Sequence, residues 1–204
     1  MAIFLIRHGE TLGNASRTVQ LPDNPLSPRG VAQAACLARR LRTAGIAAIL
    51  SSDFSRAAAT AEHLRRITGA PISYDPLLQE RNFGDLRGTP YAELGLDMFA
   101  PDYAPPGGET WELFHARVDR AWALVQNAAA AADGHLAVVT HGLVCRSLAA
   151  RHLILLEGQE VPVRWENTAL TVVDHPAPWR VRVLNCIAHL DDPATRTLSD
   201  SGAV

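Results

Sequence analysis

Two histidines, each beside a glycine at the end of an apolar run, are the side chains best suited to chemistry in this sequence. Arg7-His8-Gly9-Glu10 follows the apolar residues 2–6, and Thr140-His141-Gly142 follows the apolar residues 136–139. Each run predicts a buried β-strand, and ligands of open α/β sheets bind where such strands end. An arginine fork matches the geometry of a phosphate, and an imidazole can accept a phosphoryl group. The pattern therefore predicts a phosphoryl-binding site that contains Arg7 and His8.

Three further polar residues could complete such a site. Arg56 follows a second predicted strand and stands at the start of a helix, where the helix N-terminus favours anions. Glu80 lies between apolar residues in an irregular segment, where partial desolvation raises the pKa of a carboxyl and suits it to general acid catalysis. Asn14 follows His8 closely and can donate to a phosphate oxygen. Taken singly, each feature has a simpler interpretation: a strand-closing histidine, an exposed arginine or a solvated glutamate.

The composition is that of an ordinary soluble protein without a large excess of either charge. The chain has 204 residues, of which 48% are hydrophobic and 20% charged, with a net charge of −2. This size predicts one domain with a sizeable core, and the charge gives no reason to expect nucleic acid as a partner. All 19 basic residues are arginine, so no lysine can act as a Schiff base, a general base or a phosphate ligand.

The cysteines and the apolar runs indicate the compartment. Cys36, Cys145 and Cys186 are far apart, which argues against a zinc site or a disulfide framework, and we expect them to be small buried residues. The first residues enter a strand without the pattern of a signal peptide. No apolar run approaches the ~20 residues that span a bilayer. We therefore expect a cytoplasmic protein without a membrane partner.

Strands and helices alternate along the chain. Predicted strands cover 2–6, 46–50, 71–74 and 136–140, and a terminal hairpin pairs 167–173 with 179–186. Predicted helices cover 28–43, 55–68, 111–132 and 143–153. This alternation predicts an α/β fold: a three-layer α/β/α sandwich with a mostly parallel central sheet. We expect residues 1–190 to form one domain, with 75–108 as an irregular cap over the site and one short helix near 89–94. Residues 191–204 are predicted to be a polar C-terminal tail.

In their order along the chain, these motifs resemble those of the histidine phosphatase superfamily, in the branch of the cofactor-dependent phosphoglycerate mutases and their phosphatase relatives. The matching segments are 5–11, Asn14, 26–30 with Gln33, 51–57, 60–61, 80–84, 106–109 with 117–118, and 139–142. The resemblance implies that His8 is the nucleophile that becomes phosphohistidine. It also implies that Arg7, Arg56 and His141 hold the phosphoryl oxygens, with Asn14 assisting.

The resemblance assigns further roles. Glu80 is expected to protonate the leaving alkoxide and then to activate water. Thr11, Phe83 and Gly142 stand in the same motifs and are predicted to bind substrate. No metal and no other cofactor are expected, because two guanidinium groups and a histidine can stabilise the transferring phosphoryl group. The expected partner is a small phosphomonoester, and a homodimer is common among relatives.

Departures from the family pattern bear on the substrate. Gly13 stands where relatives often carry an aromatic residue, and residues 85–88 replace a common Trp-Glu-Gly. We interpret Arg87, in that segment, as a solvated loop charge rather than a substrate contact. Residues 91–106 are short compared with the insertion of mutases, which favours a hydrolase. Most apolar residues of this segment (Leu94, Leu96, Met98, Phe99 and Tyr103) are expected to pack on the long helix. The alternatives are a phosphoglycerate mutase and a non-catalytic sensor of a phosphorylated ligand.

Overall fold

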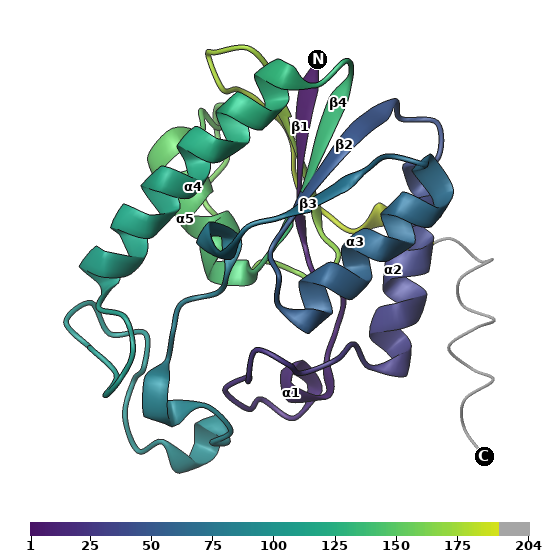
Figure 1. The fold of residues 1–204 in the computed structure, drawn as a ribbon. Helices are drawn as coiled ribbons and strands as arrows, with labels where there is room; N and C mark the ends of the chain where they lie inside the picture. Colours follow the sequence, from purple (N-terminus) through teal and green to yellow (C-terminus); the bar gives the residue numbers. More distant parts are fainter. Residues whose placement is uncertain (192–204) are drawn as a thin grey trace.

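A central sheet lies between two layers of helices (Figure 1). Successive side chains of its strands point to opposite faces, and apolar side chains are buried on both faces. The computed structural model describes residues 1–191. The strands are β1 (Ala2–Arg7), β2 (Ile46–Ser51), β3 (Ile72–Tyr74), β4 (His135–Thr140), β5 (Leu170–Asp174) and β6 (Val181–Cys186). Their order in the sheet is β3-β2-β4-β1-β5-β6. The first four strands are parallel, and β5 and β6 add an antiparallel hairpin beside β1.

Two layers of helices cover the sheet, with α2 and α3 on one face and α4 and α5 on the other (Figure 1). The helices are α1 (Leu12–Ala15), α2 (Pro28–Arg40), α3 (Ser55–Thr68), α4 (Trp111–Ala131) and α5 (Gly142–His152), and single 3₁₀ turns form at Pro76–Leu78, Gly84–Leu86, Tyr91–Glu93 and Ala188–Leu190. On β1, Ile3 and Leu5 pack under α4, whereas Ile6 packs under α2 and α3. The three-layer α/β sandwich predicted from the sequence is thereby confirmed.

Element boundaries differ from the predictions at a few places. Helix α2 ends at Arg40 rather than near residue 43, because Leu41 leaves the helical conformation and caps the last turn. The hairpin strand β5 begins at Leu170, not at 167, because Thr168 has a positive φ of 56°.

The short α1 was not predicted; Thr11 caps it through a reciprocal bond with Asn14. The predicted helix near 89–94 is one of three 3₁₀ turns within 75–108. Apart from Asp191, the predicted tail 191–204 lies outside the described residues.

The main chain of the loop after β1 packs directly against the main chain of the first turn of α2. A Cβ on Gly30 would lie 1.9 Å from the carbonyl oxygen of Glu10, and one on Gly9 would lie 2.6 Å from the carbonyl oxygen of Gly30. Ser27, the N-cap of α2, also donates its backbone N–H to Glu10 at 2.8 Å. These close contacts fix the chain that carries His8.

We therefore expect Gly30→Ala to lower the free energy of unfolding by about 3 kcal/mol, because the new methyl group has no room against the main chain. The measurement is the midpoint of urea unfolding. The neighbouring Val31, 43% exposed on the same helix, provides a matched control. Val31→Ala should change stability by less than about 0.5 kcal/mol. Similar midpoints for both variants would contradict this account of the packing.

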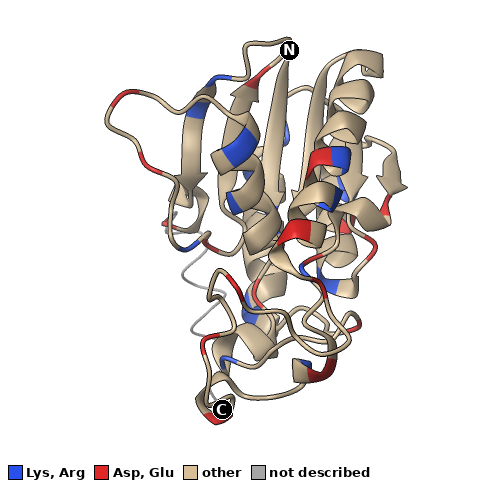
Figure 2. Ribbon diagram, turned by 90° about the vertical axis from the view of Figure 1, so that its left-hand side faces the viewer, with Lys and Arg blue, Asp and Glu red and all other residues tan. Residues whose placement is uncertain are grey.

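Charge and hydropathy on the described part of the chain are unexceptional. In the view of Figure 2, basic and acidic segments are interspersed along the helices and loops rather than gathered on one side. Among residues 1–191, no helix is both long and apolar enough to cross a bilayer. The cytoplasmic location stays a prediction.

Candidate active site

The sheet topology brings the two histidine motifs together. Strands β1 and β4 are parallel neighbours, with Arg7 paired to Thr140 in register. The residue that follows each strand is a histidine, so His8 and His141 lie at the same edge of the sheet. His8 donates its backbone N–H to Thr140 at 2.9 Å, and the His8 and His141 rings lie 5.1 Å apart, edge to face.

His8 is held with one ring nitrogen free of a proton. Its Nδ1 donates to the carbonyl oxygen of Gly9 at 2.7 Å, which leaves a lone pair on Nε2. Arg56, the second residue of α3, donates to that Nε2 from its Nε at 3.3 Å. The His8 ring is 2% exposed, and burial, with the nearby charges of Arg56 and Arg7, lowers the pKa of His8 well below 6.5. His8 is thus a neutral imidazole, as a nucleophile must be.

Two guanidinium groups flank this ring, and within residues 1–191 no carboxylate is bound directly to either. Arg56 donates from Nη1 to the carbonyl oxygen of Leu21 at 2.9 Å, and burial lowers its pKa to about 10. Arg7 donates from Nη1 to the carbonyl oxygen of Trp165. Both groups stay charged at neutral pH, so they are ready to bind an anion.

Two buried nitrogen atoms near His8 have no hydrogen-bond partner among the described residues. They are Nε of Arg7 and Nδ1 of His141. His141 contacts the hydroxyl of Ser52 through Nε2 at 2.9 Å. When Ser52 donates in that bond, Nδ1 of His141 carries the proton and is itself a donor. An unsatisfied buried donor costs about 1–3 kcal/mol, and anionic oxygens bound between these side chains would satisfy both.

Glu80 supplies a carboxyl group to the same cavity. Its two oxygens accept the backbone N–H groups of Arg81, at 3.0 Å, and of Leu143, at 3.2 Å. Burial raises the pKa of Glu80 above 4.5, although these bonds and the charges of Arg56 and Arg7 act in the opposite direction. A raised pKa favours the protonated form of the carboxyl, which a general acid requires.

An ion pair holds the main chain of the loop that carries Glu80. Arg117 on α4 bonds both oxygens of Glu109, at 2.7 and 2.8 Å, and both side chains are largely buried. The same guanidinium donates to the carbonyl oxygens of Leu77, Gln79 and Glu80. The motif residues Glu109 and Arg117 therefore act on Glu80 through the main chain.

A cavity of about 620 Å³ collects most of the predicted site residues. Its walls include Arg7, His8, Asn14, Arg56, Glu80, Phe83 and Gly142. His141 is fully buried and is not among the lining residues. Thr11 also lies outside the lining: its hydroxyl donates to Gln20 at 2.6 Å and accepts the N–H of Asn14 at 3.0 Å. Its role as a substrate-binding residue stays a prediction, and the visible role is to cap α1.

Asn14 is held in place by a residue that the sequence did not single out. Asn167, which follows the Trp165 segment, donates from Nδ2 to the Asn14 side-chain oxygen at 3.2 Å and to the carbonyl oxygen of His8 at 3.1 Å. This leaves the amide nitrogen of Asn14 available to a ligand. Ser52 lies in the matching segment 51–57, but its contact with His141 was not predicted, and the carbonyl oxygen of Trp165 was missed. No motif could have revealed a carbonyl, because every residue has one.

The cap departs from the sequence interpretation in two ways. The half-buried Arg87 lines the catalytic cavity, which favours the alternative of a substrate contact over a solvated loop charge. Leu94, Met98 and Tyr103 pack with Val19 and Phe83, not on the long helix α4. The cap thus has a small core of its own.

Arg81 organises that cap. The side chain is 1% exposed, and its guanidinium donates to the carbonyl oxygens of Met98, Tyr103 and Glu109. It also lies 3.9 Å from the centre of the Trp111 ring. One arginine therefore ties the loop after Glu80 to the later part of the cap and to the start of α4.

The cysteines follow their predicted character with one exception. Cys36 and Cys145 are buried, whereas Cys186 is partly exposed and accepts a bond from Arg40 at 3.3 Å. Within the part of the chain that the structure describes, no group of three or more His, Cys, Asp or Glu side chains is placed to hold a metal ion.

The fold and the grouping of two histidines with two buried arginines are those of phosphatases that use histidine. The chain belongs to the histidine phosphatase superfamily, branch 1, whose family model matches residues 3–186.

Individual relatives match over nearly their whole length. The Yersinia pestis protein named "Probable phosphoglycerate mutase GpmB" is 31% identical over an alignment 219 residues long, which covers 95% of this chain and 97% of the relative. The structure of a mycobacterial glucosyl-3-phosphoglycerate phosphatase with VO3 is 27% identical, with a TM-score of 0.77 over 91% of this chain and 98% of the other. The structure of the alpha-ribazole phosphatase from Shigella flexneri is 26% identical, with a TM-score of 0.78 over 92% of this chain and 97% of the other.

Proposed function

We propose that this protein is a metal-independent phosphomonoesterase that hydrolyses a small phosphorylated metabolite through a phosphohistidine on His8. The observation that carries the proposal is the unprotonated Nε2 of His8, between two arginines and beside the partnerless Nδ1 of His141. A nucleophile surrounded by unsatisfied donors suits an electrophile with several anionic oxygens, which a phosphoryl group is.

In the first step, Nε2 of His8 attacks phosphorus and the bond from phosphorus to the ester oxygen breaks. Arg7, Arg56 and His141 hold the three other oxygens, with the amide of Asn14 assisting. Glu80 gives its proton to the departing oxygen, so the product leaves as a neutral alcohol. The Gly9 carbonyl accepts Nδ1–H throughout, which stabilises the charge that the ring gains.

In the second step, the Glu80 carboxylate takes a proton from water, whose oxygen attacks the phosphorus. The bond from phosphorus to Nε2 breaks, inorganic phosphate leaves, and both His8 and Glu80 return to their starting forms. One carboxyl thus serves first as acid and then as base, as its raised pKa allows.

The test is steady-state phosphate release from a panel of sugar phosphates, phosphoglycerates, nucleotides and phosphoamino acids. One preferred substrate would support the phosphatase and identify its substrate class. If phosphate binds but no member of the panel is turned over, the non-catalytic sensor would be favoured instead.

A phosphoglycerate mutase is the second candidate, because one of the relatives carries that name. A mutase must keep its phosphoenzyme from water while the substrate reorients, and the short segment 91–106 favours hydrolysis. The test is incubation with 3-phosphoglycerate and 2,3-bisphosphoglycerate. Rapid formation of 2-phosphoglycerate without phosphate release would replace the phosphatase by the mutase.

Catalysis should survive removal of metal ions. Arg7, Arg56 and His141 provide the positive charge and donors that Mg²⁺ supplies in other phosphoryl-transfer enzymes. We expect the rate of phosphate release after dialysis against EDTA to stay within about twofold of the untreated rate. A loss that only added metal restores would exclude the metal-independent mechanism.

A further inference from the structure

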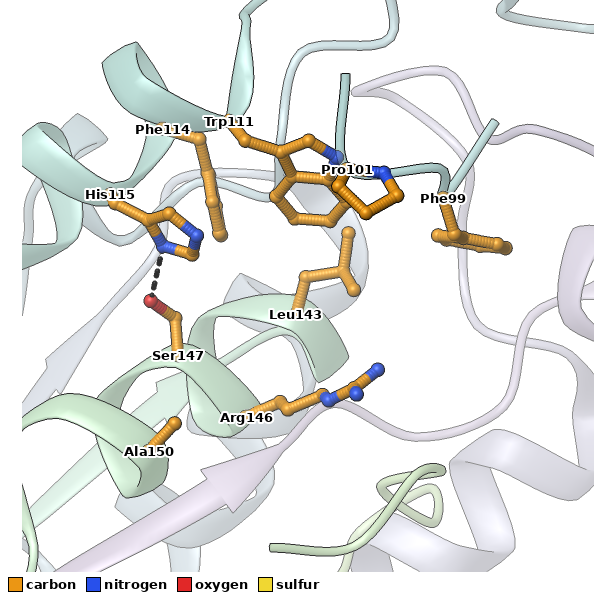
Figure 3. Close-up of a pocket in the computed structure, with 9 residues that line it drawn as sticks. All are labelled: Phe99, Pro101, Trp111, Phe114, His115, Leu143, Arg146, Ser147 and Ala150. Atoms are coloured by element: carbon orange, nitrogen blue, oxygen red, sulfur yellow. Dashed lines mark hydrogen bonds between the residues drawn. The ribbon is translucent and has the colours of Figure 1, made fainter. Parts of the chain in front are cut away.

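A second cavity, of about 400 Å³, adjoins the catalytic cavity (Figure 3). Phe99, Leu143 and Arg146 line both, so the two are contiguous. The other walls come from Pro101 in the cap, from the start of α4, with Trp111 and His115, and from one face of α5, with Ser147 and Ala150. No step of the proposed reaction uses this side cavity.

The side cavity lies where the leaving group must go. The oxygen of Glu80 that bonds the Leu143 N–H belongs to the carboxyl that would protonate the leaving oxygen. The carbon attached to that oxygen therefore lies near Leu143, at the start of α5. Leu143, Ser147 and Ala150 share one face of the helix, and Ala150 is about 10 Å further along it. This length matches a ring on a short chain.

The walls of the side cavity favour a flat apolar group. The His115 ring stacks on Trp111, with centres 5.7 Å apart and planes at 23°, and its Nδ1 pairs with the Ser147 hydroxyl at 2.9 Å. Because these polar atoms satisfy each other, the walls present mainly ring faces and aliphatic carbon. Burial also lowers the pKa of His115 below 6.5, so its ring is neutral at pH 7.

An aromatic wall joins the two cavities. Phe99 is 45% exposed, and its ring meets those of Phe83 and Tyr91 edge to face, at 6.2 and 6.4 Å. Both of these rings line the catalytic cavity. The exposed guanidinium of Arg146, at the junction, can stack on a bound ring.

We propose that the side cavity binds the alcohol part of the substrate and selects phosphomonoesters whose alcohol ends in a planar aromatic ring. The inference rests on the proposed function, because the place of the leaving oxygen beside Glu80 comes from it. The Leu143 contact sets the direction of the leaving group, and the Trp111–His115 pair with Phe99 supplies the surface for the ring.

The experiment compares 3-phenylpropyl phosphate with n-propyl phosphate, whose leaving oxygens have nearly the same chemistry. We expect kcat/KM to be at least about tenfold higher for the phenyl ester, which corresponds to about 1.4 kcal/mol. Ala150→Phe, at an exposed helix position, fills the side cavity and should reduce that preference at least about fivefold. The control Ala130→Phe, also exposed and about 22 Å along α4 from His115, should retain it.

The outcomes separate the two proposals. Equal kcat/KM values for the two esters, with turnover that depends on His8, overturn the side cavity and leave the phosphatase standing. If neither ester is hydrolysed, calorimetric titration with the two matching phosphonates decides. Binding of 3-phenylpropylphosphonate at least about tenfold tighter than that of propylphosphonate, lost in Ala150→Phe, supports the side cavity although the phosphatase fails. Equal affinities for the two phosphonates overturn the proposed role of the side cavity.

Discussion

Replacing His8 by alanine is expected to lower kcat for phosphate release by at least about 10³-fold, because the covalent route is lost. Nothing else in the cavity can replace the ring: Nε2 of His8 is the nitrogen that Arg56 contacts, whereas Nε2 of His141 is bonded to the Ser52 hydroxyl. The measurement is steady-state hydrolysis of the best ester of the panel, together with detection of an acid-labile phosphoryl group on the enzyme after rapid quenching.

His63→Ala is the matched control for this variant. His63 is half-buried on α3, outside the cavity, and its substitution should leave turnover within about twofold. Circular dichroism of both variants checks that they fold. Wild-type rates in a folded His8→Ala protein would remove the phosphohistidine mechanism altogether.

Replacing Glu80 by glutamine should discriminate between substrates according to their leaving group. For an alkyl phosphate, we expect kcat/KM to fall by about 10²–10⁴-fold, because the alkoxide then leaves unprotonated. For p-nitrophenyl phosphate we expect a loss below about tenfold, since nitrophenolate needs little protonation. The parameter kcat/KM is the suitable one, because it reports the steps up to phosphoryl transfer and excludes the later attack of water.

The same carboxyl predicts a pH dependence. Burial raises the pKa of Glu80 above 4.5, and only its protonated form can act as the acid. The alkyl-ester kcat/KM should therefore fall as the pH rises through that pKa. Protonation of His8 should not cut the rate on the acid side until much lower pH, because its pKa lies well below 6.5.

The control for Glu80 is Glu93→Gln, at an exposed position of the cap. It should behave like the wild type with both esters. Equal losses of kcat/KM on alkyl and nitrophenyl esters in Glu80→Gln would exclude Glu80 as the general acid. So would a fall of the alkyl-ester kcat/KM with rising pH that is the same in Glu80→Gln as in the wild type.

The sequence by itself determined the class of this protein and the residue types of its chemistry. Apolar runs ending in Arg7-His8 and in His141 are local patterns, and parallel strands place their ends at one edge of a sheet. The starts of the main helices also follow from local chemistry, since Ser27 and Thr110 cap α2 and α4 with their side chains. These features depend on neighbours in sequence, which is why they can be inferred without coordinates.

Only the tertiary structure decided what surrounds that chemistry. The carbonyl oxygens of Trp165 and Leu21 hold the two arginines, and main-chain oxygens leave no trace in residue types. The position of Arg87 in the cavity wall depends on how the cap folds over its own apolar core. The side cavity exists because faces of α4 and α5, distant in sequence, meet beside Phe99. Contacts of this kind depend on packing between separate elements, which sequence periodicity does not specify.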